Sequence, residues 1–260
     1  MGALHLITTS PLSEAEKQWL QNFERKLETL IGNRTLTTAF LDPRQLELAE
    51  VALRRENDLG YTVFGGYPEA ERNLLYIFPA QYQENLPDLE AIQVSWKGPV
   101  GQIGHRDLLG AVLALGLKRD QIGDIIVTDE QKAVVIVAAA QAAYISVNLT
   151  EVGQVKVACA ITDISSLPLP EDDGRDIKGT VPSLRLDAVA SLGFGLSRSR
   201  VVLLIKGGLA RVNWRPVNSP ALQLKEGDQV SIRGKGRLLL TAVEGETRKG
   251  RIHLKLKRYS

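Results

Sequence analysis

The chain has very little of the chemistry that holds metals or crosslinks. Its 260 residues include one cysteine and three histidines, and His5, His105 and His253 lie far apart in the sequence. A single thiol cannot form an internal disulfide, and no CxxC pair is present to supply zinc ligands. We therefore expect no metal site and no cofactor, and we predict that Cys159, in an apolar run, is a buried small side chain.

Motifs of the common nucleotide-using enzymes are also missing. The glycines at 98, 101 and 104 do not have GxGxxG spacing, and there is no GxxxxGK[ST] sequence. His105, Arg106 and Asp107 invite a catalytic interpretation, but neighbouring residues on a helix do not face one another and cannot form an acid–base relay. We predict a structural turn and helix start there, with His105 and Arg106 as an auxiliary RNA contact in the alternative. No catalytic residue is assigned.

Long apolar runs are the third absence. The longest, at 133–147, contains Gln141 and is too short for a membrane-spanning helix. The first residues lack the basic and apolar regions of a signal peptide. We expect no integral membrane segment, and a location in the cytoplasm or in an equivalent compartment such as the plastid stroma.

What the chain does have is a strong asymmetry of charge. The formal net charge is only +2, from 32 Lys and Arg against 30 Asp and Glu. From residue 183 onward, however, 16 basic residues face 5 acidic ones, so this part carries +11 and the remainder carries about −9. Such segregation is typical of a polyanion-binding module joined to a neutral or acidic body.

Residues 1–87 are predicted to form a mainly helical α/β domain. Ser13 and Glu16 form a capping-box pattern before an amphipathic run. Asp42 and Pro43 fit the N-cap and first turn of a second helix. The other expected features are a helix end at 32–33, a second helix end near Gly60, and strands at 61–64 and 74–78 around a glycine turn.

Residues 88–166 alternate in the order strand, helix, strand, strand, helix, strand. This order predicts the ferredoxin-like arrangement that many RNA-recognition (RRM-like) domains use, although fold alone does not give function. Residues 167–182, rich in proline and acidic side chains, are predicted to be a linker. The expected strands are 91–96, 124–128, 133–137 and 155–161, and the expected helices are 106–117 and 139–147.

Residues 183–260 are predicted to begin with two short helices. Gly193 is expected to end the first, and Ser197 to cap the second, at 198–206. Arg198 and Arg200 would then lie in a first turn, where free backbone amides and the helix dipole already favour an anion. Arginines in that position are unfavourable for the helix but suited to phosphate, although a merely solvated basic helix start is the alternative.

A β-hairpin-like continuation is expected after the helices, with strands at 209–214 and 230–233. Trp214, in the turn region, could stack on an unpaired base or belong to the core. The last strand, at 251–258, alternates between apolar and basic residues, so its cations either contact RNA or protect an exposed edge strand from aggregation.

The C-terminal motifs together resemble the S4 domain, a small RNA-binding module. They are LRLD at 184–187, SRSR at 197–200, Ile205, GG at 207–208, VN at 212–213 and GD at 227–228. The resemblance implies a two-helix plus β-hairpin domain that lies on structured RNA, with contacts from its second helix and its asparagine-containing turn. The expected RNA-binding residues are Arg185, Arg198, Ser199, Arg200, Lys206, Arg211, Asn213, Lys235 and Arg237, with Trp214, His105 and Arg106 as weaker candidates.

A second resemblance covers nearly the whole chain. FGGY at 64–67, AER at 70–72, GHRDLLG at 104–110, LGLKR at 115–119 and IGDII at 122–126 are similar to the YlmH family. That family implies an α+β protein with an N-terminal domain, an RNA-recognition-like middle and a C-terminal S4 domain. It also implies ribosome association, on large subunits holding stalled peptidyl-tRNA during quality control, with ribosomal RNA and tRNA as partners. Within the family, the chain looks most like the cyanobacterial and plastid branch called photosystem II S4 domain proteins.

Two other functions stay open at this point. The same surface could serve a photosystem II assembly or regulatory factor that binds a messenger RNA or a protein. An RNA-modifying enzyme is the third possibility, but in pseudouridine synthases the S4 module usually precedes a long catalytic domain, and the HIGH and KMSKS motifs of tyrosyl-tRNA synthetases are missing. We therefore expect a non-enzymatic RNA-binding protein.

Overall fold

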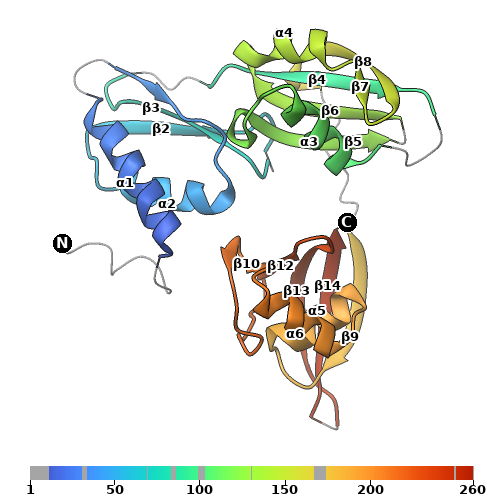
Figure 1. Ribbon diagram of the computed structural model, residues 1–260. Helices are drawn as coiled ribbons and strands as arrows, with labels where there is room; N and C mark the ends of the chain where they lie inside the picture. The colour runs from blue at the N-terminus through green and yellow to red at the C-terminus, as the bar shows by residue number, and fades with distance from the viewer. Residues whose placement is uncertain are drawn as a thin grey trace. The chain divides into compact units, whose positions relative to one another are not determined.

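The computed structural model describes residues 12–30, 34–68, 70–82, 86–98, 103–129, 131–166, 174–248 and 250–259. The chain forms two compact units, Met1–Pro170 and Glu171–Ser260. Helices and strands occur in both units (Figure 1), so the α+β class expected from the sequence is confirmed.

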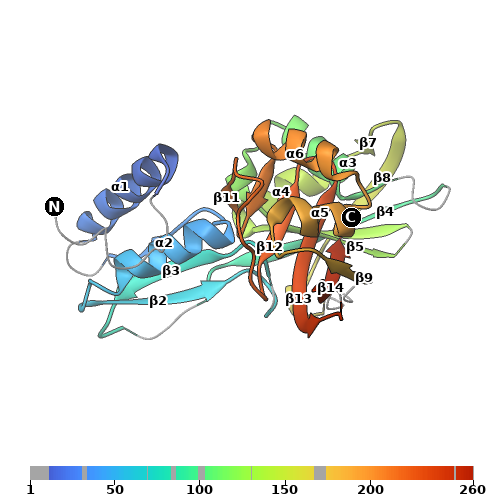
Figure 2. The same ribbon diagram turned by 90° about the horizontal axis from the view of Figure 1, so that it is seen from below.

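The N-terminal part of the first unit has two helices on one side of a small sheet (Figure 2). Helix α1 (Glu14–Glu28) begins with the predicted capping box, in which Ser13 Oγ accepts from the Glu16 amide and the Glu16 carboxylate accepts from the Ser13 amide. Helix α2 (Pro43–Leu53) begins with the same exchange between Asp42 and Gln45. The sheet has the order β1-β3-β2, with β1 at Leu36–Thr37, β2 at Leu59–Phe64 and β3 at Leu74–Pro79.

Two helix ends differ from the predictions for this part. The predicted stop of α1 at 32–33 lies outside the described residues, and α1 ends at Glu28. Helix α2 ends at Leu53, well before Gly60. Gly60 belongs instead to β2, opposite Phe78, where a Cβ would come within 2.6 Å of the phenyl ring. The glycine is needed for this close packing and not for a helix end.

The middle part of the first unit is ferredoxin-like, as predicted. Its strands lie in the order β5-β6-β4-β8-β7 with antiparallel pairings, and α3 (His105–Ala114) and α4 (Ala139–Asn148) cover one face. The core between them includes Val94, Leu108 and Ile145. The strands are β4 at Leu89–Trp96, β5 at Ile122–Asp129, β6 at Lys132–Ala138, β7 at Glu151–Val152 and β8 at Val155–Thr162, with short 3₁₀ turns at Arg119–Gln121 and Ile164–Ser166.

The other face of the middle sheet is partly covered by the N-terminal part. Because side chains alternate along a strand, Val134 and Ile136 in β6 point away from the face that Val135 shares with the helices. Val134 and Ile136 form a second buried cluster with Phe40 and Leu74 from the N-terminal part. This is the face on which many RNA-recognition domains stack bases.

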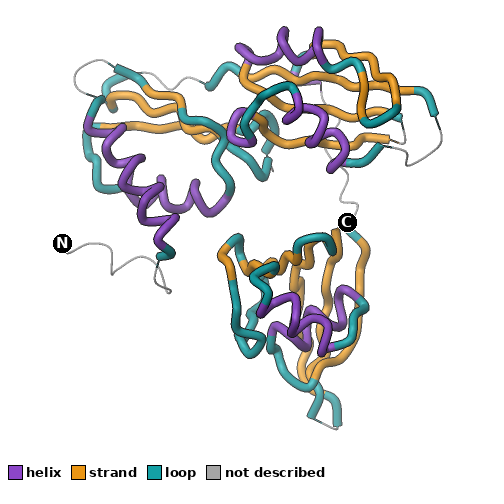
Figure 3. The backbone as a smooth tube through the Cα atoms, viewed as in Figure 1, coloured by secondary structure: helices purple, strands orange, loops and turns teal. Residues whose placement is uncertain are grey.

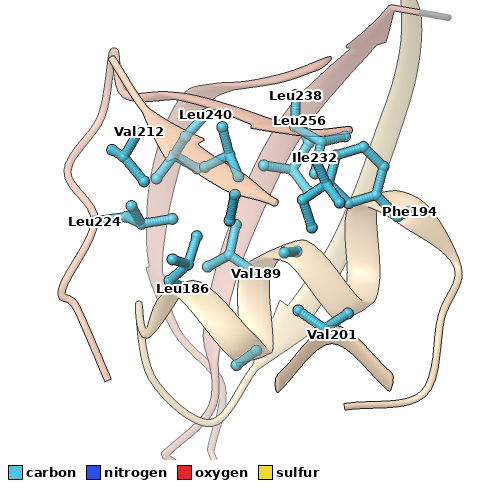
Figure 4. Packing of buried hydrophobic residues seen from close by; sticks show 14 of the residues in the cluster. Leu186, Val189, Phe194, Val201, Val212, Leu224, Ile232, Leu238, Leu240 and Leu256 are labelled. Carbon is cyan, nitrogen blue, oxygen red and sulfur yellow. The ribbon is translucent and has the colours of Figure 1, made fainter. Parts of the chain in front are cut away.

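In the C-terminal unit, two helices lie across one face of a six-stranded sheet (Figures 1 and 3). Helix α5 (Leu186–Phe194) packs Leu186 and Val189 against residues that include Leu240 and Leu256 (Figure 4). Helix α6 (Arg198–Lys206) is capped by Ser197 as predicted. The strands, in sheet order, are β11 (Arg215–Pro216), β10 (Ala210–Val212), β12 (Gln229–Ile232), β13 (Gly236–Glu246), β14 (Ile252–Tyr259) and β9 (Arg175–Val181).

No single helix in the described part of the chain is long and apolar enough to cross a membrane. Helices α5 and α6 satisfy the length and composition test only when taken together, and they are bent by 116° at their junction.

The predicted end of the first C-terminal helix at Gly193 is wrong. Helix α5 continues to Phe194 and ends at Gly195, whose φ of 65° is the left-handed conformation typical of a helix C-terminus. Gly193 lies within the helix against the sheet, where a Cβ would approach Leu238 within 2.4 Å. Close packing, and not chain reversal, explains the glycine at 193.

Two further corrections concern the sheet. Part of the predicted linker is strand β9, which pairs with β14 from Ile252↔Val181 to Arg258↔Arg175. Strand β14 is therefore not an edge strand, since β13 pairs with its other side. The predicted hairpin is only part of a larger sheet. Strand β14 belongs to that sheet, has a partner strand on each side, and contributes its apolar side chains to the core under α5.

Candidate nucleic-acid interface

The first turn of α6 presents three of the predicted residues to solvent. Ser197 Oγ accepts a hydrogen bond from the Arg200 amide at 3.3 Å, and Arg198, Ser199 and Arg200 are all exposed. The hydroxyl groups of Ser197 and Ser199 lie 3.2 Å apart. The remaining backbone amides of the turn and the helix dipole favour an anion, and both arginines add positive charge at the same place.

Helix α6 also carries an exposed stripe that continues from Arg200. Residues three apart lie on one face of a helix, so Arg200, Leu203 and Lys206 are aligned. All three are exposed, Leu203 to 64%. Sequence reasoning identified the two cations but missed Leu203, although the spacing of the three residues was the signal. An apolar side chain between cations can contact a ribose or a base edge while the cations contact phosphates.

Asp187 joins two of the predicted arginines into one cluster. Its carboxylate, 4% exposed, accepts hydrogen bonds from Nε and Nη2 of Arg185 at 3.1 and 3.0 Å. The same two atoms of Arg198 donate to it at 3.0 Å each. The Arg185 and Arg198 side chains are 36% and 47% exposed. Because each arginine uses its Nε edge on the carboxylate, its Nη1 group remains on the opposite edge for another acceptor.

The charge state of this cluster follows from its contacts. Burial raises the pKa of the Asp187 carboxyl, but the hydrogen bonds from Arg185 and Arg198 outweigh burial and hold that pKa below the usual aspartate value. Asp187 is therefore anionic at neutral pH, and the cluster has a net charge of +1. A buried anion thus fixes two solvent-accessible cations, the half-buried Arg185 and the exposed Arg198, without neutralising both.

The turn between β10 and β11 is closed by Asn213. Asn213 and Trp214 have φ of 48° and 63°. Both values lie in the left-handed region, which is uncommon for residues other than glycine and asparagine. Asn213 Nδ2 donates to Asp228 at 2.8 Å, and its Oδ1 accepts from the Gln229 amide at 2.8 Å. The polar atoms expected to contact RNA therefore already hold this turn against the 227–228 loop. Trp214 is half-buried and lies outside the core cluster.

The remaining C-terminal candidates belong to the sheet. Lys235 is exposed in the turn between β12 and β13. Arg211 is exposed on β10, and the guanidinium of Arg237 lies 5.4 Å from the centre of the Tyr259 ring. The register places Arg211 opposite Ser231, and Ser231 opposite Arg237. The alternate residues of these strands are in the core under α5 and α6, so Arg211 and Arg237 lie on the face away from the helices.

His105 and Arg106 are exposed in the first turn of α3, in the other unit. Asp107 Oδ2 accepts from the Gly104 amide at 2.9 Å, so the carboxylate caps the helix. This contact confirms the predicted structural turn and helix start. In the described ranges, no group of three or more His, Cys, Asp or Glu side chains is arranged to hold a metal ion.

Cys159 is only half-buried, contrary to the prediction of a buried side chain. Its thiol donates to the carbonyl of Leu149 at 3.3 Å, and burial raises its pKa to about 11. At neutral pH the sulfur is therefore protonated and poorly nucleophilic.

A partly buried polar network explains motifs whose role the sequence did not reveal. Asp124 in β5 accepts from Tyr67 Oη at 2.7 Å and from the Glu71 and Arg72 amides at 2.7 and 3.1 Å. Arg72 in turn donates to the carbonyls of Phe40 and Ile122 at 2.8 and 3.1 Å. These contacts join the N-terminal part to the middle sheet. The motifs at 64–67, 70–72 and 122–126, on which the resemblance to the YlmH family was based, supply most of the residues of this network.

Comparison with known proteins agrees with this division of the chain. The family "YlmH, N-terminal" matches residues 31–82, "Putative RNA-binding domain in YlmH" matches 87–166, and "S4 domain" matches 184–230. The Ribosome-associated protein quality control protein P2 of Bacillus subtilis (strain 168) is 38% identical over 218 residues, covering 83% of this chain and 84% of that protein. The chain belongs to the YlmH family of S4-domain RNA-binding proteins. The resemblance inferred from the motifs is confirmed at this level.

Two other similarities cover only part of this YlmH-family chain. The small ribosomal subunit protein uS4 of Geobacter sp. (strain M21) is 41% identical over 70 residues, which are 25% of this chain and 34% of that protein. A solved structure of cell division protein ylmH from Streptococcus pneumoniae aligns with a TM-score of 0.51 and 18% identity, over 61% of this chain and 97% of that one. At that identity the structural match shows the fold alone.

Proposed function

We propose that this YlmH-family chain is a non-enzymatic protein that binds structured RNA on the ribosome through the α6 face. The α6 face comprises Arg185, Arg198, Ser199, Arg200 and Lys206. The observation that carries the proposal is the buried Asp187 carboxylate, which fixes Arg185 and Arg198 beside the exposed Arg200 at the amino end of α6. The name of the Bacillus subtilis relative supports the ribosomal setting.

The geometry is suited to the RNA backbone. Free amides at the start of α6 and the outward edges of two guanidinium groups can donate to phosphate oxygens. Because Asp187 already restricts both arginine side chains, less conformational entropy is lost when a phosphate binds. Contacts of this kind give affinity and orientation but carry no base sequence. The proposed target is therefore a folded ribosomal RNA or tRNA that is recognised by its shape. The proposed setting is the large subunit during quality control.

The middle domain has a limited part in this proposal. The N-terminal part covers Val134 and Ile136 on the sheet face that would stack bases in an RNA-recognition domain. Any contribution from this domain then comes from its helical side, where His105 and Arg106 are exposed. The proposed location is the cytoplasm or the plastid stroma, and a link to photosystem II is the alternative to a ribosomal role.

The direct test is co-sedimentation with separated ribosomal subunits over a salt series. Wild type is compared with Arg200→Gln, with Arg198→Gln/Arg200→Gln, and with Lys26→Gln/Arg54→Gln, a control that removes two exposed cations from the first unit. Each lost phosphate contact lowers the slope of log affinity against log salt by about one unit. We expect the α6 double variant to bind large subunits more weakly with a shallower slope, and the control to match wild type.

Two results would contradict the proposal. Equal binding by the α6 double variant and wild type would move the RNA site away from α6. Binding of wild type to neither subunit would reject the ribosomal role and favour a photosystem II assembly factor that binds a messenger RNA or a protein.

A further inference from the structure

We propose that the outer sheet face is a second RNA-binding surface, which takes a single-stranded segment. The outer sheet face is the side of the C-terminal sheet turned away from α5 and α6. Its principal residues are Lys178, Arg211, Arg237, Lys255, Lys257 and Tyr259. This surface is additional to the α6 face.

The strand register places these side chains together. In β14, Leu254 and Leu256 are buried in the core, so Lys255 and Lys257 project from the opposite face. Lys255 is paired with Lys178 in β9. Further along the sheet, Arg211, Ser231, Arg237 and Tyr259 form one cross-strand row through β10, β12, β13 and β14.

The face is positively charged. The outer sheet face has five cations. Two acidic residues lie beside its lysines, Asp176 opposite Lys257 and Glu244 in contact with Lys255. Lys255 forms an ion pair with Glu244, whose pKa is lowered first by the hydrogen bond from Lys255 and then by Lys178 and His253. Lys178 and Arg211 are exposed, and among the described residues neither side chain forms a hydrogen bond or a direct ion pair, although Lys178 is close enough to Glu244 to lower its pKa. A polyanion can therefore approach these two cations without first breaking a direct ion pair.

The side-chain chemistry of the outer sheet face favours an unpaired RNA strand. Tyr259 and Arg237 are both half-buried, and the planar guanidinium of Arg237 lies over the Tyr259 ring, 5.4 Å from its centre. This pair offers a flat surface on which a base can stack. Neighbouring cations contact the adjoining phosphates. A membrane surface fits less well, because docking to lipid uses exposed apolar anchors. The exposed large apolar residues described in this unit, Leu203 and Leu222, lie on α6 and in the 217–228 loop.

The surface also extends beyond the S4 module. The S4 family matches residues 184–230, whereas β9, β13 and β14 lie outside that range. Since the α6 face and the outer sheet face are on opposite sides of one unit, the protein can hold a folded RNA on one side and an unpaired strand on the other. The structure therefore assigns to the added strands a binding role separate from that of the S4 helices.

The test uses the full chain with two labelled RNAs, a short oligouridylate and a stable hairpin, in anisotropy titrations over a salt series. The outer-face variant is Lys178→Gln/Arg211→Gln/Lys255→Gln. We expect it to bind oligouridylate about tenfold more weakly, with a slope shallower by roughly two units, since each single-strand phosphate contact contributes about 0.7. The α6 double variant should keep oligouridylate binding and lose affinity for the hairpin.

Matched variants separate this proposal from simpler explanations. Lys26→Gln/Arg54→Gln should leave both titrations unchanged, and Arg237→Lys, which keeps the charge, should weaken oligouridylate binding without changing its salt slope. Circular dichroism and Tm check that each variant is folded. Binding to phosphatidylserine vesicles is measured alongside the two RNAs. The proposal is overturned if the outer-face variant binds oligouridylate like wild type, or if the outer-face variant loses only binding to the vesicles. It is also overturned if the outer-face variant and the α6 double variant lose both RNAs equally. Unchanged hairpin binding by the α6 variant would instead reject the α6 site.

Discussion

The chain contains two clusters of arginine and aspartate that use the same groups differently. In the first unit, burial raises the pKa of Asp124 and lowers the pKa of Arg72, and burial also lowers the pKa of Arg119 to about 10. In the C-terminal unit, the arginine hydrogen bonds to Asp187 outweigh its burial and lower its pKa. Each cluster is anchored by one aspartate, but the charged state is disfavoured in one and favoured in the other.

The difference lies in where the guanidinium groups donate. Arg72 donates to main-chain carbonyls of the surrounding fold. Arg185 and Arg198 donate to Asp187 from one edge, through Nε and Nη2, and their side chains remain partly exposed to solvent. The presence of arginine in a motif therefore does not show whether that arginine stabilises the fold or binds RNA. The hydrogen-bond partners of its N–H groups separate the two roles.

The largest expected effect is on the first cluster. Arg72→Ala removes the side-chain donor of the Phe40 carbonyl and leaves Arg119 as the side-chain donor to the Ile122 carbonyl. We therefore expect the free energy of unfolding of the first unit to fall by about 3 kcal/mol. Urea unfolding measures this change, with exposed Lys26→Ala as the control. RNA binding by the folded protein should be unchanged. A loss of stability no larger than that of the control would show that the network is dispensable.

The second cluster should respond in both stability and binding. Asp187→Asn removes the negative charge that pairs with both arginines, and we expect the C-terminal unit to lose about 2 kcal/mol and the hairpin affinity to fall several-fold. Arg200→Gln should reduce affinity without changing stability, because in the described structure its exposed side chain forms no hydrogen bond or ion pair. Unfolding curves and hairpin titrations of the two variants are compared. If Asp187→Asn is unstable but binds normally when folded, then Asp187 does not position the arginines.

Asn213 tests whether a motif residue serves the turn or the RNA. Asn213→Ala loses the hydrogen bonds to Asp228 and to the Gln229 amide, so we expect a loss of about 1–2 kcal/mol in unfolding free energy. Hairpin affinity of the folded variant should stay within about twofold of wild type. The opposite pattern, with normal stability and weaker binding, would restore the direct RNA contact implied by the S4 resemblance.

The smallest expected effect is a pH dependence of opposite sign in the two clusters. Asp187 has a lowered pKa in the folded state, so its stabilisation is complete above the unfolded value of about 3.9 and disappears as pH falls through the folded value. Asp124 has a raised pKa, so its contribution is greatest below about 3.9 and declines as pH rises through the folded value. We expect Asp187→Asn and Asp124→Asn to change the pH dependence of unfolding in opposite directions. Shifts of the same sign would contradict the contrast.

Local signals predicted most of the fold. Ser13 with Glu16, Asp42 with Pro43, and Ser197 each mark a helix start within four residues, so these signals are local in the sequence. The glycines at 193 and 195 could not be separated in this way, because the contact that decides between them is with Leu238, more than forty residues away. Strand β9 was assigned to a linker for a similar reason, since its pairing partner is β14.

The site was predicted less completely than the fold. The basic residues were identified from composition and from the helix start, which are visible in sequence. Two contacts depend on the folded positions of the loops and could not be read from the sequence. Asp187 bonds both Arg185 and Arg198, and Asn213 bonds Asp228. The separation of the cations onto two faces likewise requires the sheet register, which the alternation in β14 only began to suggest.

The pairing of β9 with β14 has a consequence for synthesis. Strand β9 is made before the two helices, and its only strand partner in the described sheet is made last. Leu254 and Leu256, which complete the core under α5, also arrive with β14. During translation α5 and the basic helix α6 therefore emerge well before the sheet that orders them can close. A nascent chain acquires its finished C-terminal unit only when residues of the 250s have left the exit tunnel, and an incomplete chain carries the cations without the fold.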